Sequence, residues 1–310
     1  MSAPNNLAAT RFAFLTPRSL PKAETLAGRV VVLDIAFAAD TGKTSYATVT
    51  LPFIQGLGAR LAAWVDHHDH EHHADYVGDP RFVLATKAEH GGCPEMVTPE
   101  LVARTGPVDT IAVHVDLDGL YSGAKWILGG IEPYHGADED ARKIDTRRGK
   151  PGPIADRIDR ALRARFRDEN LKQRILQYLI AGTEAPVHFQ EIDAAARLVD
   201  PLLEQAQRLS EHYRVDGGVA YLEVRSSVPY DKTELLLLGQ QRALVAVVRD
   251  AGSLAVAADF DSGLDFVKLF GLGGGMPTRV SVPESRRDEV LAKLAQTTAG
   301  LRPAGGATRS

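Results

Sequence analysis

Short apolar runs alternate with longer mixed stretches along the first half of the chain. Val30–Leu33, Leu61–Val65 and Thr110–His114 are rich in small and branched apolar residues. Runs of this length and composition are typical of strands that are buried on both faces of a parallel sheet. Polar residues stand where each run ends, so functional groups are expected at the strand ends. The same patterns predict a further strand at 82–85 and helices at 51–63, 93–104 and 122–128.

Strands that alternate with helices predict an α/β fold, with a mostly parallel sheet that carries helices on both faces. Residues 151–209 are mostly helical by pattern, and strand-like runs separated by turn residues resume from Gly217. A helical connector and a smaller C-terminal α/β domain are therefore expected. The predicted organisation is a flexible N-terminus at 1–25, a first domain at 26–150, the connector at 151–212, a second domain at 213–298 and a disordered tail at 299–310.

Composition sets coarse limits on the class of protein. A chain of 310 residues favours two domains, and contents of 44% hydrophobic and 25% charged residues are ordinary for a globular protein. No apolar run approaches the length of a membrane span, and no secretory signal is recognised. The single cysteine, Cys93, cannot form an intramolecular disulfide. We therefore expect a cytoplasmic protein without membrane association, in which Cys93 is a buried thiol.

Charge is distributed unevenly along the chain. The formal net charge of −4 offers no general attraction to nucleic acid or to anionic lipid. Residues 142–174, however, contain 12 Lys and Arg against 5 Asp and Glu. Such a block can hold phosphates, and the alternative is a solvated helix surface. An aromatic content of 6% argues against extensive base stacking.

Histidines and carboxylates gather where the three buried runs end. These residues are Asp34 after the first run, Asp66, His67 and His68 after the second, and His114, Asp116 and Asp118 at the third. Because ligands of α/β proteins bind beyond the carboxyl ends of the strands, about six ligands would surround one crevice, enough for two divalent ions. Imidazole and carboxylate suit hard to borderline ions, and the absence of nearby thiols argues against a closed structural zinc site. The alternative is a surface tract that binds metal loosely, since residues 65–73 hold five of the ten histidines.

These motifs resemble those of the DHH phosphoesterase superfamily. Val65-Asp-His-His68 and His114-Val-Asp-Leu-Asp-Gly119 look like its signature motifs, and Val30–Asp34 is similar to its second motif, a strand that ends in a metal-bridging Asp. The family includes single-strand exonucleases, oligoribonucleases, nucleotide phosphatases, cyclic dinucleotide phosphodiesterases and manganese pyrophosphatases. Residues 270–278 are similar to the glycine-rich turn of the C-terminal domain that is associated with this family. With this turn included, the resemblance extends from about residue 28 to residue 294.

The resemblance implies a role for each candidate metal ligand. His114 and Asp116 would hold one ion, and His67 and Asp118 would hold the other. Asp34 would bridge the two ions. The implied cofactor is a pair of Mn²⁺ ions, with Mg²⁺ as the alternative.

The resemblance also implies catalytic residues and one further ligand. His68 would bind the substrate or protonate the leaving oxygen of the phosphate, while Asp66 orients the motif from behind. The family's fourth motif supplies another Asp. Asp145 is the candidate for this position, and Asp138 and Asp140 are the alternatives.

The chain departs from the family pattern in two ways. The His-x-Asp-x-Asp strand usually comes first, whereas here it follows the other two motifs, which we interpret as a circular permutation. The glycine-rich turn usually ends in His, and here Met276 takes that position. Glycines allow close backbone approach to a phosphate and guanidinium groups bind it with two prongs. The residues expected to bind substrate are Gly273, Gly274, Gly275, Arg225 and Arg279.

The sequence therefore predicts a metal-dependent phosphodiesterase or phosphatase that acts on a nucleotide or a short single-stranded oligonucleotide. One alternative is a DHH-like protein that senses a nucleotide or a metal without turnover, which the altered turn suggests. Another is a pyrophosphatase, which needs a closed pocket rich in Lys and Arg. The complete set of ligands favours turnover. The sequence is compatible with a homodimer and does not determine the substrate length or the polarity of cleavage.

Overall fold

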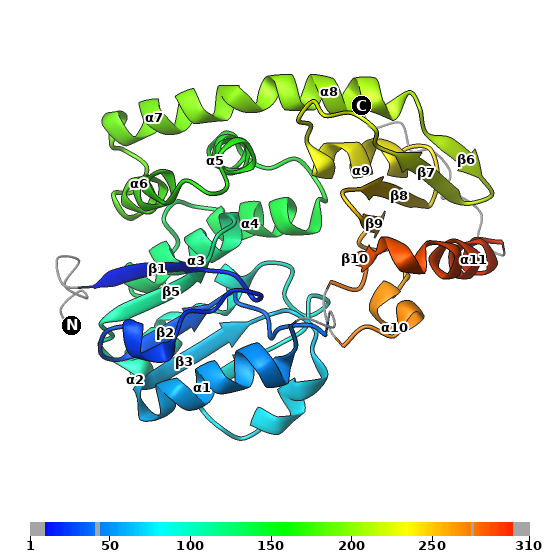
Figure 1. The fold of residues 1–310 in the computed structure, drawn as a ribbon. Coiled ribbons are helices and arrows are strands. Elements are labelled where there is room, and N and C mark those ends of the chain that lie inside the picture. The colour runs from blue at the N-terminus through cyan, green and yellow to red at the C-terminus, as the bar shows by residue number, and fades with distance from the viewer. Residues whose placement is uncertain (1–9, 41–43, 274–275, 300–310) are drawn as a thin grey trace. The chain divides into compact units, whose positions relative to one another are not determined.

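The computed structural model describes residues 10–40, 44–273 and 276–299 (Figure 1). The chain divides into two compact units, one of residues 1–198 with 273–275 and the other of residues 199–272 with 276–310. The boundary falls inside the stretch that was expected to be a connector. Helices between residues 153 and 196 therefore belong to the first unit, not to a separate linking segment.

The first unit is built on a five-stranded parallel sheet. Its strands are β1 Arg11–Leu15, β2 Val30–Leu33, β3 Leu61–Asp66, β4 Phe82–Leu84 and β5 Thr110–His114. Its α-helices are α1 Leu51–Leu57, α2 Pro99–Thr105, α3 Leu117–Ile127, α4 Ala137–Thr146, α5 Pro153–Ala164, α6 Glu169–Ile180 and α7 Pro186–Ala196. Shorter elements are a π-helix at Tyr46–Thr50 and 3-10 helices at Ala23–Thr25, Gly58–Arg60, Glu71–Tyr76, Cys93–Met96 and Arg197–Val199.

The order of strands in this sheet is β1-β5-β2-β3-β4, and every pair is parallel. Leu33 at the end of β2 is level with Val113 of β5 on one side and with Val65 of β3 on the other. The residues that follow these three strands therefore meet at one edge of the sheet. The α/β fold with a mostly parallel sheet, expected from the sequence, is confirmed.

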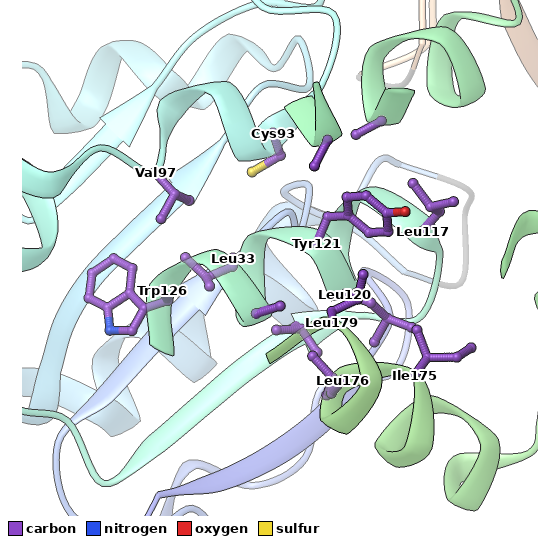
Figure 2. Packing of buried hydrophobic residues seen from close by; sticks show 14 of the residues in the cluster. Leu33, Cys93, Val97, Leu117, Leu120, Tyr121, Trp126, Ile175, Leu176 and Leu179 are labelled. Atoms are coloured by element: carbon purple, nitrogen blue, oxygen red, sulfur yellow. The ribbon is translucent and has the colours of Figure 1, made fainter. Parts of the chain in front are cut away.

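Both faces of the sheet are covered by helices. In β2, Val31 and Leu33 join a cluster with residues of α3 and α6, whereas Val30 and Val32 join a cluster with residues of α1. Figure 2 shows part of the first cluster, with side chains of α3 near those of α6. All four side chains are fully buried, which explains why the run is apolar throughout and does not alternate.

Two expectations about local structure are corrected. The first concerns Arg11–Leu15, which lies in the stretch expected to be flexible and instead forms the edge strand β1. It pairs with β5, and Phe12 and Phe14 pack against the core of the sheet, which holds the segment in place. The second concerns α3, which begins at Leu117 and not at residue 122, because Asp116 caps its first turn.

Two helices are also shorter than their patterns predict. The stretch from 51 to 63 is helical only to Leu57, because the chain turns at Gly58, where φ is +51°, and enters β3. The stretch from 93 to 104 contains a 3-10 helix and then α2, since Pro99 can start a helix but cannot continue one.

The second unit is smaller and contains a mixed sheet. Its strands are β6 Arg214–Asp216, β7 Val219–Glu223, β8 Val245–Asp250, β9 Ser253–Ala258 and β10 Arg279–Pro283, in the order β10-β9-β8-β7-β6. Its helices are α8 Asp200–Ser210, α9 Lys232–Gln240, α10 Phe266–Phe270, α11 Arg287–Thr298 and a 3-10 helix at Glu284–Arg286. Residues of α8 and α9 cover one face of this sheet and residues of α10 and α11 cover the other.

The C-terminal end of the chain lies largely outside the described residues. The predicted disordered tail does so from residue 300, and α11 ends just before it. Among the residues that the structure describes, no helix combines the length and the apolar character needed to cross a bilayer.

Candidate metal centre

Asp34 follows β2 in a backbone conformation that few residues adopt. Its φ is +60°, in the left-handed region, where Asp is tolerated better than branched residues. The side chain is 1% exposed, and neither carboxylate oxygen accepts a hydrogen bond from any described residue. A buried carboxylate without such bonds is costly, so backbone strain and unsatisfied oxygens together indicate that Asp34 serves a bound partner.

The two oxygens of Asp34 face different imidazoles. Oδ1 lies 3.2 Å from Nε2 of His67, and Oδ2 lies 3.5 Å from Nδ1 of His114. Burial, together with the nearby carboxylates of Asp118 and Asp116, raises the pKa of Asp34 to about 6, although His114 and His67 act in the opposite direction. A carboxylate that presents one oxygen to each of two groups has the arrangement of a bridging ligand.

His67 at the end of β3 is oriented by a backbone carbonyl. Its Nδ1 lies 2.7 Å from the carbonyl oxygen of His90, and because a carbonyl only accepts, Nδ1 donates this hydrogen bond. The Nε2 atom is then the one available as a ligand, and it lies 3.3 Å from Oδ2 of Asp118. The ring is fully buried.

His68 forms a pair with the carboxylate that precedes it in the motif. Its Nδ1 lies 2.8 Å from Oδ1 of Asp66, which is fully buried. Burial raises the pKa of Asp66, but the imidazoles of His68, His67 and His73 together hold it below its ordinary value, so the carboxyl group stays ionised. The carboxylate fixes the ring of His68, which is partly exposed.

The junction of β5 and α3 supplies three more groups. Asp116 accepts a hydrogen bond from the amide of Gly119 at 3.3 Å and lies 2.7 Å from Nδ1 of His114. Asp118, in the first turn of α3, accepts one from the amide of Cys93 at 3.2 Å. A Cβ atom on Gly119 would lie 2.6 Å from the carbonyl oxygen of His114, so only glycine lets the helix start this close to the strand.

The cluster attracts positive charge. Burial lowers the pKa of His114, but the carboxylates of Asp116 and Asp34 raise it well above its ordinary value. Burial and a nearby ammonium group lower the pKa of His67, but Asp118 and Asp34 outweigh them and raise it to about 10. Protons bind so strongly here because several carboxylates lie close together, which is also the electrostatic condition that favours a divalent ion.

The fourth-motif candidates separate in the structure. Oδ2 of Asp145 on α4 lies 3.8 Å from Nε2 of His67. Asp138 instead pairs with the ammonium of Lys125, and Asp140 accepts a hydrogen bond from a backbone amide at 2.7 Å. Of the three candidates, Asp145 is therefore the one that the structure brings to the cluster.

These residues form three overlapping groups with ligand atoms close enough to share a cation. The groups are Asp34 with His114 and Asp116, Asp34 with His67 and His68, and His67 with Asp118 and Asp145. All seven side chains expected at the metal or substrate from motifs one to four are present in them, and Asp66 stands behind His68. The donor set contains imidazole and carboxylate only, which fits Mn²⁺ or Mg²⁺ better than structural zinc.

One residue of the cluster, Lys87, is not part of any motif recognised in the sequence. Lys87, which follows β4, is 2% exposed. Its ammonium lies 3.0 Å from Nε2 of His67 and forms an ion pair with Asp145. No local pattern marks this lysine, because its burial results from the arrangement of β4 and α4 around the strand ends.

Cys93 is buried and free, as expected. Burial and the carboxylates of Asp34 and Asp118 raise the pKa of its thiol well above the usual value, so it is unsuited to act as a nucleophile. Its contribution to the centre is the backbone amide that binds Asp118.

The expected phosphate-binding residues stay a prediction. Arg225 and Arg279 belong to the second unit, where Arg225 pairs with Glu223 at 3.1 Å and Arg279 donates to Oγ1 of Thr233 at 3.0 Å. Gly273 is described, whereas Gly274 and Gly275 lie outside the described residues.

The basic block at 142–174 is extensively paired within the first unit. Its ion pairs include those of Arg147 and Arg163 with Asp159, Arg157 with Asp193 and Arg174 with Glu191. Carboxylates of the helices therefore balance much of the positive charge. For these paired residues, a charged helix surface fits better than a phosphate-binding block.

The fold and the site define an α/β protein with a histidine–carboxylate centre at the carboxyl ends of β2, β3 and β5. No protein-family model and no curated protein sequence matches the chain. Among solved structures, it is similar to the pGpG-specific phosphodiesterase PggH from Vibrio cholerae, with 12% identity and a TM-score of 0.43, over 88% of this chain and 99% of that one. It is also similar to the exonuclease RecJ bound to manganese, with 14% identity and a TM-score of 0.44, over 88% of this chain and 76% of that one.

Proposed function

We propose that the chain is a metal-dependent phosphoester hydrolase of the DHH type, with two cation positions that share Asp34. The observation that carries this proposal is the carboxylate of Asp34, which is buried, accepts no hydrogen bond from the described residues, and presents Oδ1 to His67 and Oδ2 to His114. A bridged pair of cations is a recurrent device for phosphoester cleavage. Mn²⁺ is the proposed ion, since the ligands mix imidazole with carboxylate.

Each ligand has a proposed place in this arrangement. His114 and Asp116 would complete one cation position, and His67 and Asp118 with Asp145 would complete the other. Cations held there supply Lewis-acid polarisation of the phosphoryl group and neutralise its charge. The second role matters because the carboxylates of the cluster would otherwise repel a phosphate.

His68 is the proposed proton donor. Its Nδ1 lies 2.8 Å from Oδ1 of Asp66, which fixes the ring, and the proposal assigns Nε2 to hydrogen-bond the substrate. We propose that a water molecule attacks the phosphorus and forms the new P–O bond, while Nε2 of His68 binds the phosphate and passes a proton to the leaving oxygen as the ester bond breaks; the proton released by the water replaces it. Because Asp66 is buried and fixes the ring, the proton is delivered from a defined direction.

The order of motifs along the chain is compatible with this function. β5, β2 and β3 are neighbours in the sheet, so the His-x-Asp-x-Asp, Asp and Asp-His-His motifs meet although the first of them comes last in the sequence. Spatial order, and not chain order, decides which ligands share a cation. A permutation that keeps the packed layers would therefore keep the site, which supports our interpretation.

The proposed substrate is a nucleotide or a short single-stranded oligonucleotide. The proposal includes phosphate contacts from Arg225, Arg279 and the glycines at 273–275, because guanidinium groups and exposed backbone amides are the usual partners of phosphate oxygens. Replacement of the usual His by Met276 removes one phosphate donor that the family pattern contains. The arginines would have to supply that charge.

A hydrolysis panel with added manganese tests the function. It contains a nucleoside bisphosphate, a linear dinucleotide, a cyclic dinucleotide, a single-stranded oligomer and pyrophosphate. We expect cleavage of a nucleotide substrate, loss of activity in excess chelator, and loss of activity in both His67→Ala and Asp116→Ala with the fold intact by circular dichroism.

The panel separates the alternatives. Binding of a nucleotide without turnover of any substrate would favour a sensor, and hydrolysis restricted to pyrophosphate would favour a pyrophosphatase. Full activity in chelator, or wild-type turnover in His67→Ala and Asp116→Ala, would contradict the metal centre.

A further inference from the structure

A lysine side chain lies inside one of the two proposed cation positions. Lys87 is 2% exposed, and its ammonium lies 3.0 Å from Nε2 of His67 and is paired with Asp145. His67, Asp118 and Asp145 are the three ligands of that position. A buried ammonium is costly unless it is paired, and here its partners are the atoms that a divalent ion would use.

The other cation position contains no such group among the described residues. Asp34, His114 and Asp116 have their ligand atoms close together, and both oxygens of Asp34 are without a hydrogen bond from the described residues. The two positions therefore differ in their built-in charge: one contains a lysine and the other does not.

We infer that Lys87 competes with a divalent cation for the position formed by His67, Asp118 and Asp145, so that the two positions fill with unequal affinity. The inference rests on the proposed cation centre. The lone pair on Nε2 of His67 accepts one partner at a time, whether a proton, an N–H of Lys87 or a metal ion. Entry of an ion at this position must push the ammonium away and break its pair with Asp145. Entry at the other position displaces no lysine.

This competition would make activity depend on the concentration of free metal. The first ion would fill the position of Asp34, His114 and Asp116. The pair of cations would stay incomplete until a second ion displaces Lys87. A lysine in this place also balances the carboxylates of the metal-free protein, which protects the fold when metal is scarce.

The test measures the binding of manganese to the full chain by calorimetry and by equilibrium dialysis. For the wild type we expect one tight ion and a second ion at least tenfold weaker. In Lys87→Met the ratio of the two affinities is expected to shrink at least tenfold, because the competitor is gone. Lys87→Gln is the second variant, in case the methionine variant does not fold, and it should change the ratio in the same direction.

Lys125→Met is the matched control. Lys125 is also a buried lysine of the first unit and is also paired with an aspartate, Asp138, but it lies outside the three candidate ligand groups. Its loss should leave the ratio of the two affinities unchanged. An equal change in this control would mean that loss of any buried lysine loosens the centre, and the inference would be overturned.

The remaining outcomes separate this inference from the proposed function. Two manganese ions that bind to the wild type with equal affinity, or an affinity ratio that Lys87→Met and Lys87→Gln leave unaltered, would overturn the role of Lys87 and leave the metal centre standing. Failure of the wild type and of both variants to bind manganese would overturn both.

Discussion

At the scale of single residues, the site depends on Asp34. It combines a left-handed backbone, full burial and two oxygens without hydrogen bonds from the described residues. Each of these features costs free energy in the metal-free protein, and none of them helps the sheet to form. A residue that weakens the fold and serves a ligand should show opposite effects on stability and on binding when it is replaced.

Asp34→Asn is therefore expected to abolish manganese binding and hydrolysis while it raises the stability of the metal-free protein. The amide keeps the shape and tolerates the left-handed backbone, but it removes a buried negative charge whose pKa is raised to about 6. The gain in the free energy of unfolding at pH 8 should be on the order of 1–3 kcal/mol. Thermal and urea unfolding in chelator measure it.

The control for this variant is Asp159→Asn. Asp159 is also buried, but it pairs with Arg147 and Arg163 away from the candidate ligand groups. Its replacement should lower stability and leave manganese affinity unaltered. A loss of stability in Asp34→Asn as large as that in Asp159→Asn would contradict the view that Asp34 is a strained ligand.

Manganese affinity is expected to fall as the pH is lowered, and to fall more steeply below about pH 6. The pKa of His67 is raised to about 10. The pKa of Asp34 is raised to about 6, mainly by burial. Protons therefore occupy both ligands in acid. Each proton must leave before a cation binds, so affinity rises with pH, and below pH 6 the proton on Asp34 must be displaced as well. Binding titrations from pH 5 to pH 8 measure this slope, and a flat profile would contradict it.

At the scale of elements, the contact between β5 and α3 sets the geometry of the ligands. The helix starts at Leu117 directly after the strand, so Asp116 and Asp118 are held by the cap and the first turn. This arrangement depends on Gly119, where a Cβ atom would meet the carbonyl of His114 at 2.6 Å. The glycine of the motif therefore serves packing, and through packing it positions the ligands.

Gly119→Ala should therefore weaken manganese binding at least tenfold in the molecules that remain folded. The added methyl group pushes the start of α3 away from β5, which moves Asp116 and Asp118 relative to His114. Gly56→Ala is the control, because its Cβ atom would lie 2.8 Å from that of Ala23 on the other side of the sheet. Both variants should lose about 1–3 kcal/mol of stability, as overpacked sites do. Equal manganese affinities for the two variants would show that the glycine does not position the ligands.

At the scale of the whole molecule, the two units divide the work that we propose. Every candidate metal ligand lies between residues 34 and 145, in the first unit, whereas β10 and the arginines at 225 and 279 belong to the second unit. Each unit has its own core, so damage to one need not reach the other.

Gly274→Val is expected to raise the Michaelis constant for the nucleotide substrate at least tenfold and to leave manganese affinity unchanged. A side chain in the run of three glycines would hold a phosphate away from the backbone, whereas no candidate metal ligand is altered. Steady-state kinetics and manganese titration on the same preparation test this. Unchanged kinetics would contradict a role of the glycine run at 273–275 in binding the substrate.

The sequence predicts more of the site than of its surroundings. The end of a buried strand can be recognised locally, so Asp34, His67 and His114 were recognisable from the apolar runs before them. The place of Lys87 depends on where β4 and α4 pack, and the strand at Arg11–Leu15 depends on a partner about a hundred residues later. Such long-range pairs leave no local pattern. The start of α3 was missed because the cap at Asp116 was interpreted only as a ligand.

The position of β5 in the sheet has a consequence for biosynthesis. It is the last of the five strands to leave the ribosome, yet it is inserted between β1 and β2. Until then, β1 lacks its neighbour in the described sheet and β2 has an open edge, which is a template for association with other chains. The strand that closes this gap also ends in His114. A nascent chain that pauses before residue 110 therefore lacks the complete sheet and also the candidate metal ligands His114, Asp116, Asp118 and Asp145. It gains the first of these ligands together with the strand.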